Sequence, residues 1–409
     1  MENVKELLAR IGEGVCLEGN DAGIRVRAVY QPLAGAGTRL FPPTYPGAEK
    51  NGPPQYVTER RMVSGVETST VVVDALQSQA NRVEQAVLDA LDVGLFELPH
   101  LNLCGEIAGQ PFRVTSLDAP HRSPDAYFRD SEIDGQTFDA TPVGKALRAS
   151  SDRNARSIFG YSPMDLVLGL WDSHRSGRGA KIPRSYTSEM IGINAIRGSR
   201  AAGRLDPENI PKTDLVSSNT DKSDWDLAEF EGATKKLKNP KNPVDPKKQE
   251  STTKPSEIGH GNALSGSEKT PGGFTVERVE RVGYVSFAAL ARLRFPDEGR
   301  TVPAADQAAR ALLASLALLG DVLAFGGPSV FVRSGTILVP EEQVYEFVGP
   351  RFTETVDIDR SGALALFSLA VNEAKAAGLP WSEPINLSPK ANLRKLVELA
   401  RTSAQDEGD

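Results

Sequence analysis

Residues 71–91, VVVDALQSQANRVEQAVLDAL, carry the clearest structural signal in the sequence. The three consecutive valines predict a buried strand, because short apolar runs of β-branched residues are typical of strands. Directly after them, Leu76, Ala80, Val83, Val87 and Leu91 recur at helical spacing. This stretch therefore predicts a strand that leads straight into an amphipathic helix.

Further apolar patterns predict a sheet and additional helices. Residues 23–33, GIRVRAVYQPL, alternate apolar side chains with Arg25 and Arg27, as in a strand with one buried and one polar face. The other strands that we expect cover residues 112–116, 166–171, 284–295 and 330–339, and the other helices cover 304–319, 362–377 and 393–401. This irregular mixture favours an α+β sheet domain that carries long insertions.

Composition indicates a globular protein without a disulfide framework. The 409 residues are 39% hydrophobic and 25% charged, and the two cysteines, Cys16 and Cys104, form no CxxC pair and no zinc-binding spacing with histidine. No apolar run approaches the roughly 18 residues of a membrane span, and the nucleotide-binding pattern GxxxxGK[ST] is absent. We therefore expect a cytoplasmic protein with no membrane partner, no metal and no cofactor.

The net charge of −7 argues against bulk attraction to nucleic acid, but positive charge is concentrated locally. Residues 171–204 contain seven basic and two acidic side chains. Within them, residues 173–184, SHRSGRGAKIPR, combine glycines with four basic side chains, so that backbone amides and guanidinium groups can approach phosphates closely. The pattern predicts contacts with an RNA backbone, and its alternative is a solvated basic loop.

Polar side chains also cluster in the first turns of the helix that follows the valines. Gln77 and Asn81 share one helix face, and Ser78 and Arg82 share another, because each pair is four residues apart. An ordinary solvated face would favour Glu and Lys over these amides. The cluster is typical of either an internal hydrogen-bond network or a contact with RNA or another subunit.

Residues 121–125, HRSPD, contain a possible general base, His121, and a possible transition-state cation, Arg122, for RNA cleavage. Loop residues with Pro and Asp more often form turns. No suitably spaced partner is found among His100, His174 and His260. We therefore expect no catalytic residues.

Residues 357–362, DIDRSG, imitate the start of a calcium loop. The twelfth position is Ser368, where calcium needs a bidentate Glu. We expect Asp359 or Ser361 to cap a helix instead.

Four segments together suggest a family: VVVDALQSQANRVEQAVL, APHRSPDAYFRDS, YSPMDLVLGLWDSHRSGRGAKIPRSYTSEMIGINA and GSRAAGRLDP. In this order they resemble the RAMP-type backbone subunit of subtype I-G (formerly I-U) CRISPR interference complexes, of the Cas seven family. The likeness covers most of residues 23–207 and, thinly, residue 273 onward. It implies a modified RRM-like (ferredoxin-like) palm with inserted finger and thumb elements.

The resemblance, with the composition, implies three regions. Residues 1–206 would form the first part of the palm with inserted loops, and residues 274–409 the second part with C-terminal helices. Residues 207–273 are rich in Lys, Asn, Pro and Ser and predict a mobile insert. Within the family, a thumb tip is one interpretation of this insert. Its part around residues 234–270 is longer than expected for the family.

The resemblance implies a structural subunit whose copies bind one CRISPR RNA and display the guide for pairing with target DNA. Its expected partners are the CRISPR RNA, target DNA through the guide, neighbouring copies of itself and other Cascade subunits. Together with the arginines of the first strand, the expected RNA contacts are Arg25, Arg27, Gln77, Ser78, Asn81, Arg82, His121, Arg122, Arg178, Lys181, Arg184, Arg200 and Arg204.

The alternative is an endoribonuclease that cleaves target or precursor RNA, because relatives of these backbone subunits in type III complexes cut RNA with a loop aspartate. Asp125 and Asp130 would be the candidates here.

Overall fold

The computed structural model describes most of the chain as two units, one built from residues 1–43, 56–196 and 274–398, the other from residues 44–55, 197–273 and 399–409. The described residues are 2–16, 18–47, 54–172, 180–199, 202–208, 210, 215–218, 221–227, 230–231, 236–237, 251–261, 263–265 and 271–406.

An eight-stranded sheet forms the centre of the larger unit, and all of its strand pairs are antiparallel. The strand order is β23-β24-β1-β22-β12-β5-β4, and β25 also pairs with β24. Their bounds are β1 Gly23–Pro32, β4 Thr58–Val63, β5 Val66–Asp74, β12 Tyr186–Ile193, β22 Arg278–Ser286, β23 Val330–Arg333, β24 Thr336–Gly349 and β25 Phe352–Val356. The predicted strands at 23–33 and 71–73 are thus confirmed.

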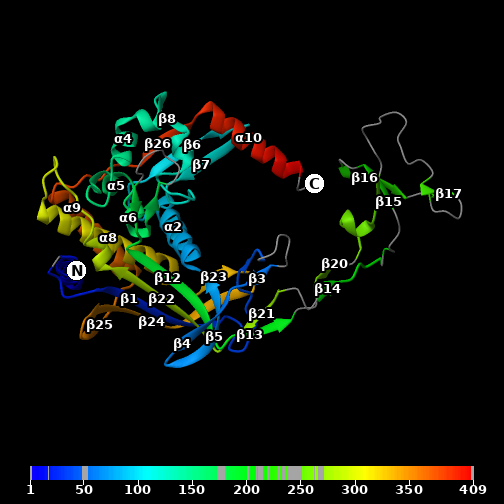
Figure 1. Ribbon diagram of the computed structural model, residues 1–409, viewed down its shortest axis with the longest axis horizontal. Helices are drawn as coiled ribbons and strands as arrows, with labels where there is room; N and C mark the ends of the chain where they lie inside the picture. The colour runs from blue at the N-terminus through cyan, green and yellow to red at the C-terminus, as the bar shows by residue number, and fades with distance from the viewer. Residues whose placement is uncertain are drawn as a thin grey trace. The chain divides into compact units, whose positions relative to one another are not determined.

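Helices pack on this sheet, with α2 beside β12 and α8 beside β22 (Figure 1). The helices are α1 Glu2–Gly14, α2 Leu76–Asp92, α8 Pro303–Phe325 and α9 Arg360–Ala376. Asp359 is the N-cap of α9 and accepts a hydrogen bond from the Gly362 amide at 2.7 Å, so the predicted cap is confirmed.

The helix α8 is apolar over most of its surface, which is typical of a helix in a protein core. Contrary to the expectation from sequence, it is long and apolar enough to cross a membrane by length and composition. However, 83% of its most apolar window is buried inside the fold. One charged pair links α8 to the sheet: Arg281 of β22 donates twice to Asp321, at 2.7 and 3.0 Å, and both side chains are fully buried.

A second, five-stranded sheet in the larger unit has the order β7-β6-β26-β8-β9. Its strand β26 pairs in parallel with β6, although more than 270 residues separate them. The strands are β6 Leu101–Ile107, β7 Gln110–Thr115, β8 Ser131–Ile133, β9 Gln136–Thr137 and β26 Ile385–Pro389. The helices along this part of the chain are α3 Ala126–Arg129, α4 Pro142–Arg148, α5 Arg156–Tyr161, α6 Met164–Leu168 and α10 Ala391–Asp406, with the 3-10 turn η1 Phe138–Ala140.

The smaller unit contains short strands in its described residues. The strand β15 Leu215–Ser218 pairs with β16 Asp221–Leu227 and with β19 Ser251–Thr253. Other short pairs are β14 Ala202–Arg204 with β20 Ala263–Ser265, β17 Phe230–Glu231 with β18 Lys236–Leu237, and β13 Ile196–Ser199 with β21 Pro271–Thr275. The polar composition of residues 207–273 does not predict these strands, because they lack the apolar alternation of a half-buried sheet.

Three expected strands have other bounds in the structure. Residues 330–339 are not one strand, because β23 ends at Arg333 and β24 begins at Thr336 after a turn. Residues 166–171 are not one strand: α6 ends at Leu168, and only Leu170 and Trp171 are extended, as β10. Residues 284–295 are not one strand either, because Ser286 ends β22 and caps the short helix α7 Phe287–Leu290 by accepting from the Ala289 amide at 3.1 Å.

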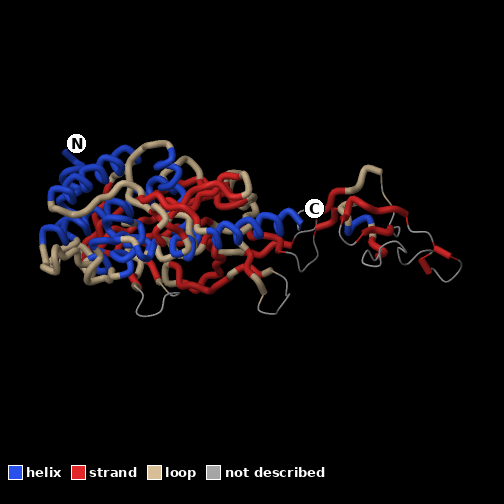
Figure 2. The backbone as a smooth tube through the Cα atoms, turned by 90° about the horizontal axis from the view of Figure 1, so that it is seen from above, coloured by secondary structure: helices blue, strands red, loops and turns tan. Residues whose placement is uncertain are grey.

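Together, the two sheets and their helices form a mixed fold with an antiparallel central sheet, compatible with the expected α+β class. Figure 2 shows helices and strands intermixed through the larger unit.

Candidate nucleic-acid interface

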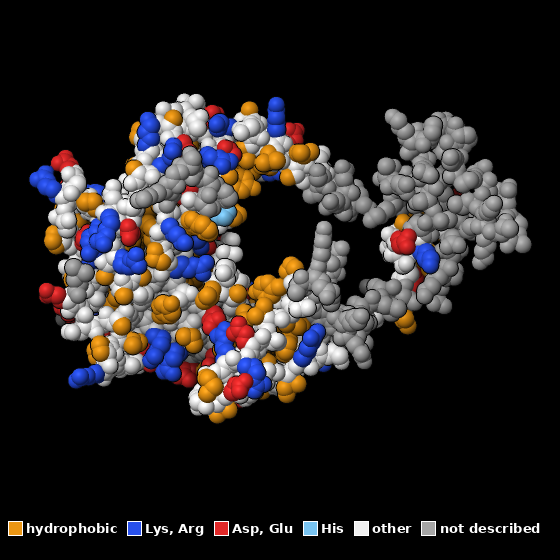
Figure 3. Space-filling view, viewed as in Figure 1, with side chains coloured by type: hydrophobic (Ala, Val, Ile, Leu, Met, Phe, Trp, Pro, Cys, Tyr) orange, Lys and Arg blue, Asp and Glu red, His pale blue; other side chains and the backbone are white. Residues whose placement is uncertain are grey.

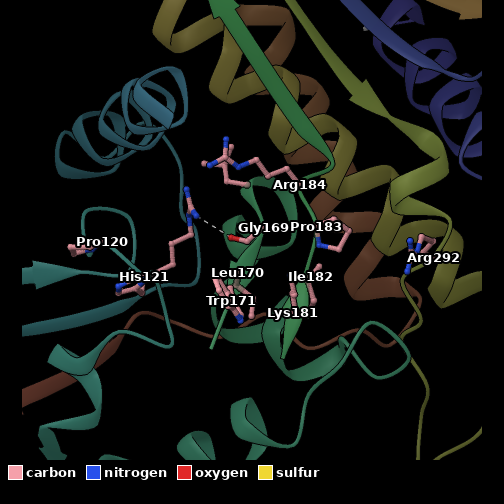
Figure 4. Close-up of a pocket in the computed structure, with 12 residues that line it drawn as sticks. Pro120, His121, Gly169, Leu170, Trp171, Lys181, Ile182, Pro183, Arg184 and Arg292 are labelled. Atoms are coloured by element: carbon pink, nitrogen blue, oxygen red, sulfur yellow. Dashed lines mark hydrogen bonds between the residues drawn. The ribbon is translucent and has the colours of Figure 1, made fainter. Parts of the chain in front are cut away.

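A hollow of about 460 Å³ in the larger unit gathers several of the predicted RNA contacts. It lies where the loop at residues 120–122, the end of α6, and the strands β10 Leu170–Trp171 and β11 Lys181–Ile182 meet (Figure 4). Its lining residues are Pro120, His121, Arg122, Leu168, Gly169, Leu170, Trp171, Lys181, Ile182, Pro183, Arg184 and Arg292. Four of them are Lys or Arg, and none is Asp or Glu.

The strands β10 and β11 present Trp171 and Lys181 as a cross-strand pair. The Lys181 ammonium lies over the indole ring of Trp171, 5.0 Å from its centroid. Successive side chains in a strand point to opposite sides, so Leu170 is buried while both Trp171 and Lys181 are exposed. The residues between these strands, including Arg178, lie outside the described part of the chain.

Arg122 forms the wall of the hollow, but its guanidinium is directed inward. Its Nε donates to Glu84 of α2 at 2.5 Å, and its Nη1 donates to the Gly169 carbonyl at 3.0 Å. Its backbone has a φ of +58°, a left-handed conformation that is uncommon for a residue with a side chain. Burial raises the pKa of Glu84 to about 7, although Arg122 opposes the shift. Arg122 therefore joins the loop to α2 and α6.

Arg184 lies next to this pair, and its positive charge is balanced less well than that of Arg122. Its Nη1 donates to the Leu76 carbonyl at 3.3 Å. Burial lowers the pKa of Arg184, Arg122 lowers it further, and Glu84 raises it. An anion in the hollow would relieve the repulsion between the two guanidinium groups.

Gly169 allows the chain to pass closely behind Arg184. It has a φ of +81°, and a Cβ atom there would lie 3.0 Å from the Arg184 amide nitrogen and the Ile182 carbonyl oxygen. Any other residue would be strained by both the backbone conformation and this close approach.

The possible catalytic carboxylates near the hollow have structural partners. Asp125 is buried and caps α3, because its side chain accepts from the amides of His121 and Tyr127, each at 2.9 Å. Asp130 pairs with its neighbour Arg129 at 2.9 Å. Among the described residues, no three His, Cys, Asp or Glu side chains gather as a metal site.

On the first turns of α2, the structure distinguishes between the predicted residues. Arg82 belongs to an internal network: its Nε donates to Asp74 at 2.7 Å, and its Nη atoms donate to the carbonyls of Phe331 and Val332 at 3.0 and 2.7 Å. Gln77 and Asn81 are exposed, and Ser78 is half-buried. Contacts of these three with RNA remain predictions.

The predicted arginines of β1 lie on the sheet, not in the hollow. Arg25 and Arg27 both pair with Glu346 of β24, at 2.8 and 3.0 Å. The hydrogen bond from Arg27 lowers the pKa of Glu346, and the bond from Arg25 lowers it further. Figure 3 shows Lys and Arg side chains in several separate groups on the described surface, with Asp and Glu beside some of them.

The remaining predicted contacts are not assembled. Arg178 and Arg200 lie outside the described residues, and Arg204 belongs to β14, where its side chain is not described. The hollow thus brings together His121, Arg122, Lys181 and Arg184.

The lining residues that sequence reasoning did not predict as RNA contacts include Trp171 and Arg292. Arg292 belongs to residues 284–295, where the sequence predicts one strand, but β22 ends at Ser286 and the chain continues as α7. The side chain of Arg292 is 67% exposed, and it pairs with the Asp152 carboxylate at 3.9 Å. An aromatic residue beside a basic, glycine-rich segment was the signal that could have identified Trp171.

Residues 24–197 match a family model described as CRISPR-associated protein GSU0053. Over these residues the chain is therefore similar to that CRISPR-associated family. The match confirms there the resemblance inferred from the sequence, and it supports a role in CRISPR defence. The match includes every lining residue of the hollow except Arg292. A comparison with curated proteins gave no match.

Proposed function

We propose that the protein is a structural backbone subunit of a Cascade-type interference complex and binds the backbone of the CRISPR RNA at this hollow. The observation that carries the proposal is its charge: four basic side chains line it, and none of its lining residues is acidic. Arginine and lysine hold phosphate oxygens by charge-assisted hydrogen bonds, and such contacts fix the register of a nucleic acid without reading its sequence.

The family supports a guide RNA as the ligand. In a CRISPR complex the guide bases must stay available for pairing with target DNA, so a protein that holds the guide should contact its backbone. A single positive groove on each of several copies would then be sufficient for a chain whose net charge is −7. Neighbouring copies would meet through unlike surfaces, because head-to-tail contacts that do not close generate a filament.

The test is charge reversal in the hollow. Lys181→Glu with Arg184→Glu should weaken binding of single-stranded guide RNA on the order of a hundredfold, since each lost charge-assisted bond is worth about 1.5–3 kcal/mol. The loss should be similar for guides of unrelated sequence. Arg351→Glu with Lys395→Glu is the matched control, because it makes the same charge change at two exposed positions outside the hollow. Unchanged affinity in the hollow variant would contradict the proposal.

We also propose that the protein holds RNA without cleaving it. The capping role of Asp125 and the pairing of Asp130 support this part, since neither carboxylate is arranged as a general base with a nearby acid. Incubation of the assembled complex with labelled complementary RNA tests it. Regular cuts that disappear in Asp130→Asn would favour the ribonuclease instead.

A further inference from the structure

Trp171 is unusually exposed for a tryptophan side chain. Its exposure is 60%, although a tryptophan side chain usually buries a large apolar area. Trp381 shows the ordinary case, because its ring packs against Phe159 and Phe367, with ring centroids 5.5 and 6.1 Å apart. The strand β10 buries Leu170 but leaves Trp171 exposed in the lining of the hollow.

Lys181 and Trp171 together form a mixed surface of aromatic ring and positive charge. The cation–π contact at 5.0 Å holds the ring against its cross-strand neighbour. Figure 4 shows the pair side by side, with His121 to one side, Arg292 to the other and Arg184 above. Aromatic faces next to cations are typical of proteins that bind single-stranded nucleic acids, because bases stack while phosphates pair with the cations.

We propose that one base of the RNA stacks on Trp171 in the hollow, with the flanking phosphates at Lys181, Arg184 and Arg292. This inference rests on the proposed function, since it names the part of the RNA that enters the same site. The volume of about 460 Å³ lies within the roughly 300–1,000 Å³ of small-ligand pockets. Every base presents a stackable face, so the site accepts any of the four bases.

Electrostatics favours phosphates at the rim. The weakly compensated Arg184 gains a partner when a phosphate arrives, and the lowered pKa of its guanidinium agrees with an incomplete site. The largely exposed Arg292 can reach an anion with little loss of its distant contact to Asp152. Glu84 stays behind Arg122, where it stabilises the wall and is buried.

The experiment combines variants of Trp171 with an abasic walk. Wild type, Trp171→Ala and Trp171→Phe are titrated against a fluorescein-labelled single-stranded RNA, and then against versions that each lack one base. Trp171→Ala should weaken binding about tenfold, within the roughly five- to hundredfold worth of one base stack. Trp171→Phe should lose about threefold at most. Abasic positions that weaken wild type should have no further effect on Trp171→Ala.

Phe352→Ala is the control, because Phe352 is also an exposed aromatic residue, but it lies on β25 and does not line the hollow. If Trp171→Ala binds RNA as wild type does while the Lys181/Arg184 reversal abolishes binding, the proposed base stacking is wrong. The proposed binding of the RNA backbone then still holds. If the reversal also has no effect, the proposed function itself fails. Should Trp171→Ala unfold, the abasic walk with wild type and Trp171→Phe decides: equal loss at every abasic position, or at none, overturns the stacking site.

Discussion

The hollow and the outward face of the central sheet are both rich in arginine, but their charges are balanced differently. On the sheet, Arg25 and Arg27 share Glu346, and Arg61 pairs with Glu189. A second hollow of about 510 Å³ lies there, and its lining includes Glu189, Glu280 and Glu342 beside Arg27 and Arg61. An anion that entered it would meet carboxylates as well as guanidinium groups.

In the hollow at β10 and β11, the only carboxylate that pairs with a lining guanidinium within hydrogen-bond distance, among the described residues, is Glu84 behind Arg122. The difference teaches that the number of arginines does not identify an anion site. What matters is whether each positive charge already has a partner inside the protein.

The largest expected difference between the two regions concerns stability. Arg122→Met should lower the free energy of unfolding by about 3–5 kcal/mol, because it leaves a buried carboxylate without a partner. Side chains of Arg122 and Glu84 are only 13% and 6% exposed. Arg27→Met should cost about 1 kcal/mol or less, because that side chain is 55% exposed and Arg25 still pairs with Glu346.

Urea unfolding at pH 8 measures both losses, since Glu84 is then ionised. The double variant Arg122→Met with Glu84→Gln should recover part of the loss, because no buried charge remains. If Arg122→Met and Arg27→Met lower the free energy of unfolding equally, the distinction between a buried ion pair and a surface ion pair is wrong.

The second difference is the direction of the pH dependence. Burial raises the pKa of Glu84 to about 7 and that of Asp165 to about 6, so their contribution to stability is complete below their ordinary values and is lost as pH rises through 6 and 7. The pKa of Glu346 is lowered, so its contribution is present above its ordinary value and is lost as pH falls below it.

Glu84→Gln should therefore flatten the decline in unfolding free energy between about pH 4.5 and 8, by roughly 3 kcal/mol at most. Glu346→Gln should change only the acidic side, below about pH 4.5. Urea midpoints measured across this pH range test both. A wild-type stability that rises steadily from pH 5 to 8 would contradict the assignment for Glu84.

The third difference is the salt dependence of RNA binding. Neutralising Lys181 and Arg184 with glutamine should reduce the slope of log affinity against log salt by about 1.4, because each phosphate contact contributes about 0.7 for single strands. Arg25→Gln with Arg27→Gln should leave the slope nearly unchanged, since both guanidinium groups are already paired. A larger change in the sheet variant would assign the RNA to the sheet face.

Local patterns were sufficient to predict much of the fold. Period-2 alternation located β1, helical spacing located α2, and the capping preference of Asp359 located the start of α9. The errors fell where local signals are ambiguous. The apolar run that contains α6 is buried on all sides, and periodicity alone does not distinguish a buried helix from a buried strand.

The candidate site was predictable only in its residue types. Lys181 and Arg184 stand out in a basic segment, but the partner of Arg122 is Glu84, 38 residues away. Two of the three partners of Arg82 are the carbonyls of Phe331 and Val332, about 250 residues away. Such contacts depend on how the sheet and helices pack. Without knowledge of these contacts, the sequence does not distinguish a structural arginine such as Arg122 from an accessible one such as Arg292.

The smallest expected effect concerns the exposed face of α2, which borders the hollow because the Leu76 carbonyl accepts from Arg184. Gln77→Ala with Asn81→Ala should change the unfolding free energy by about 0.5 kcal/mol or less, as for exposed helix positions. It should weaken RNA binding only a few fold, the worth of one or two neutral hydrogen bonds. Gln85→Ala, farther along the same helix, is the control, since its amide already pairs with Asp89 at 2.7 Å. If both variants bind RNA as wild type does, the RNA contacts end at Arg184 and do not extend onto α2.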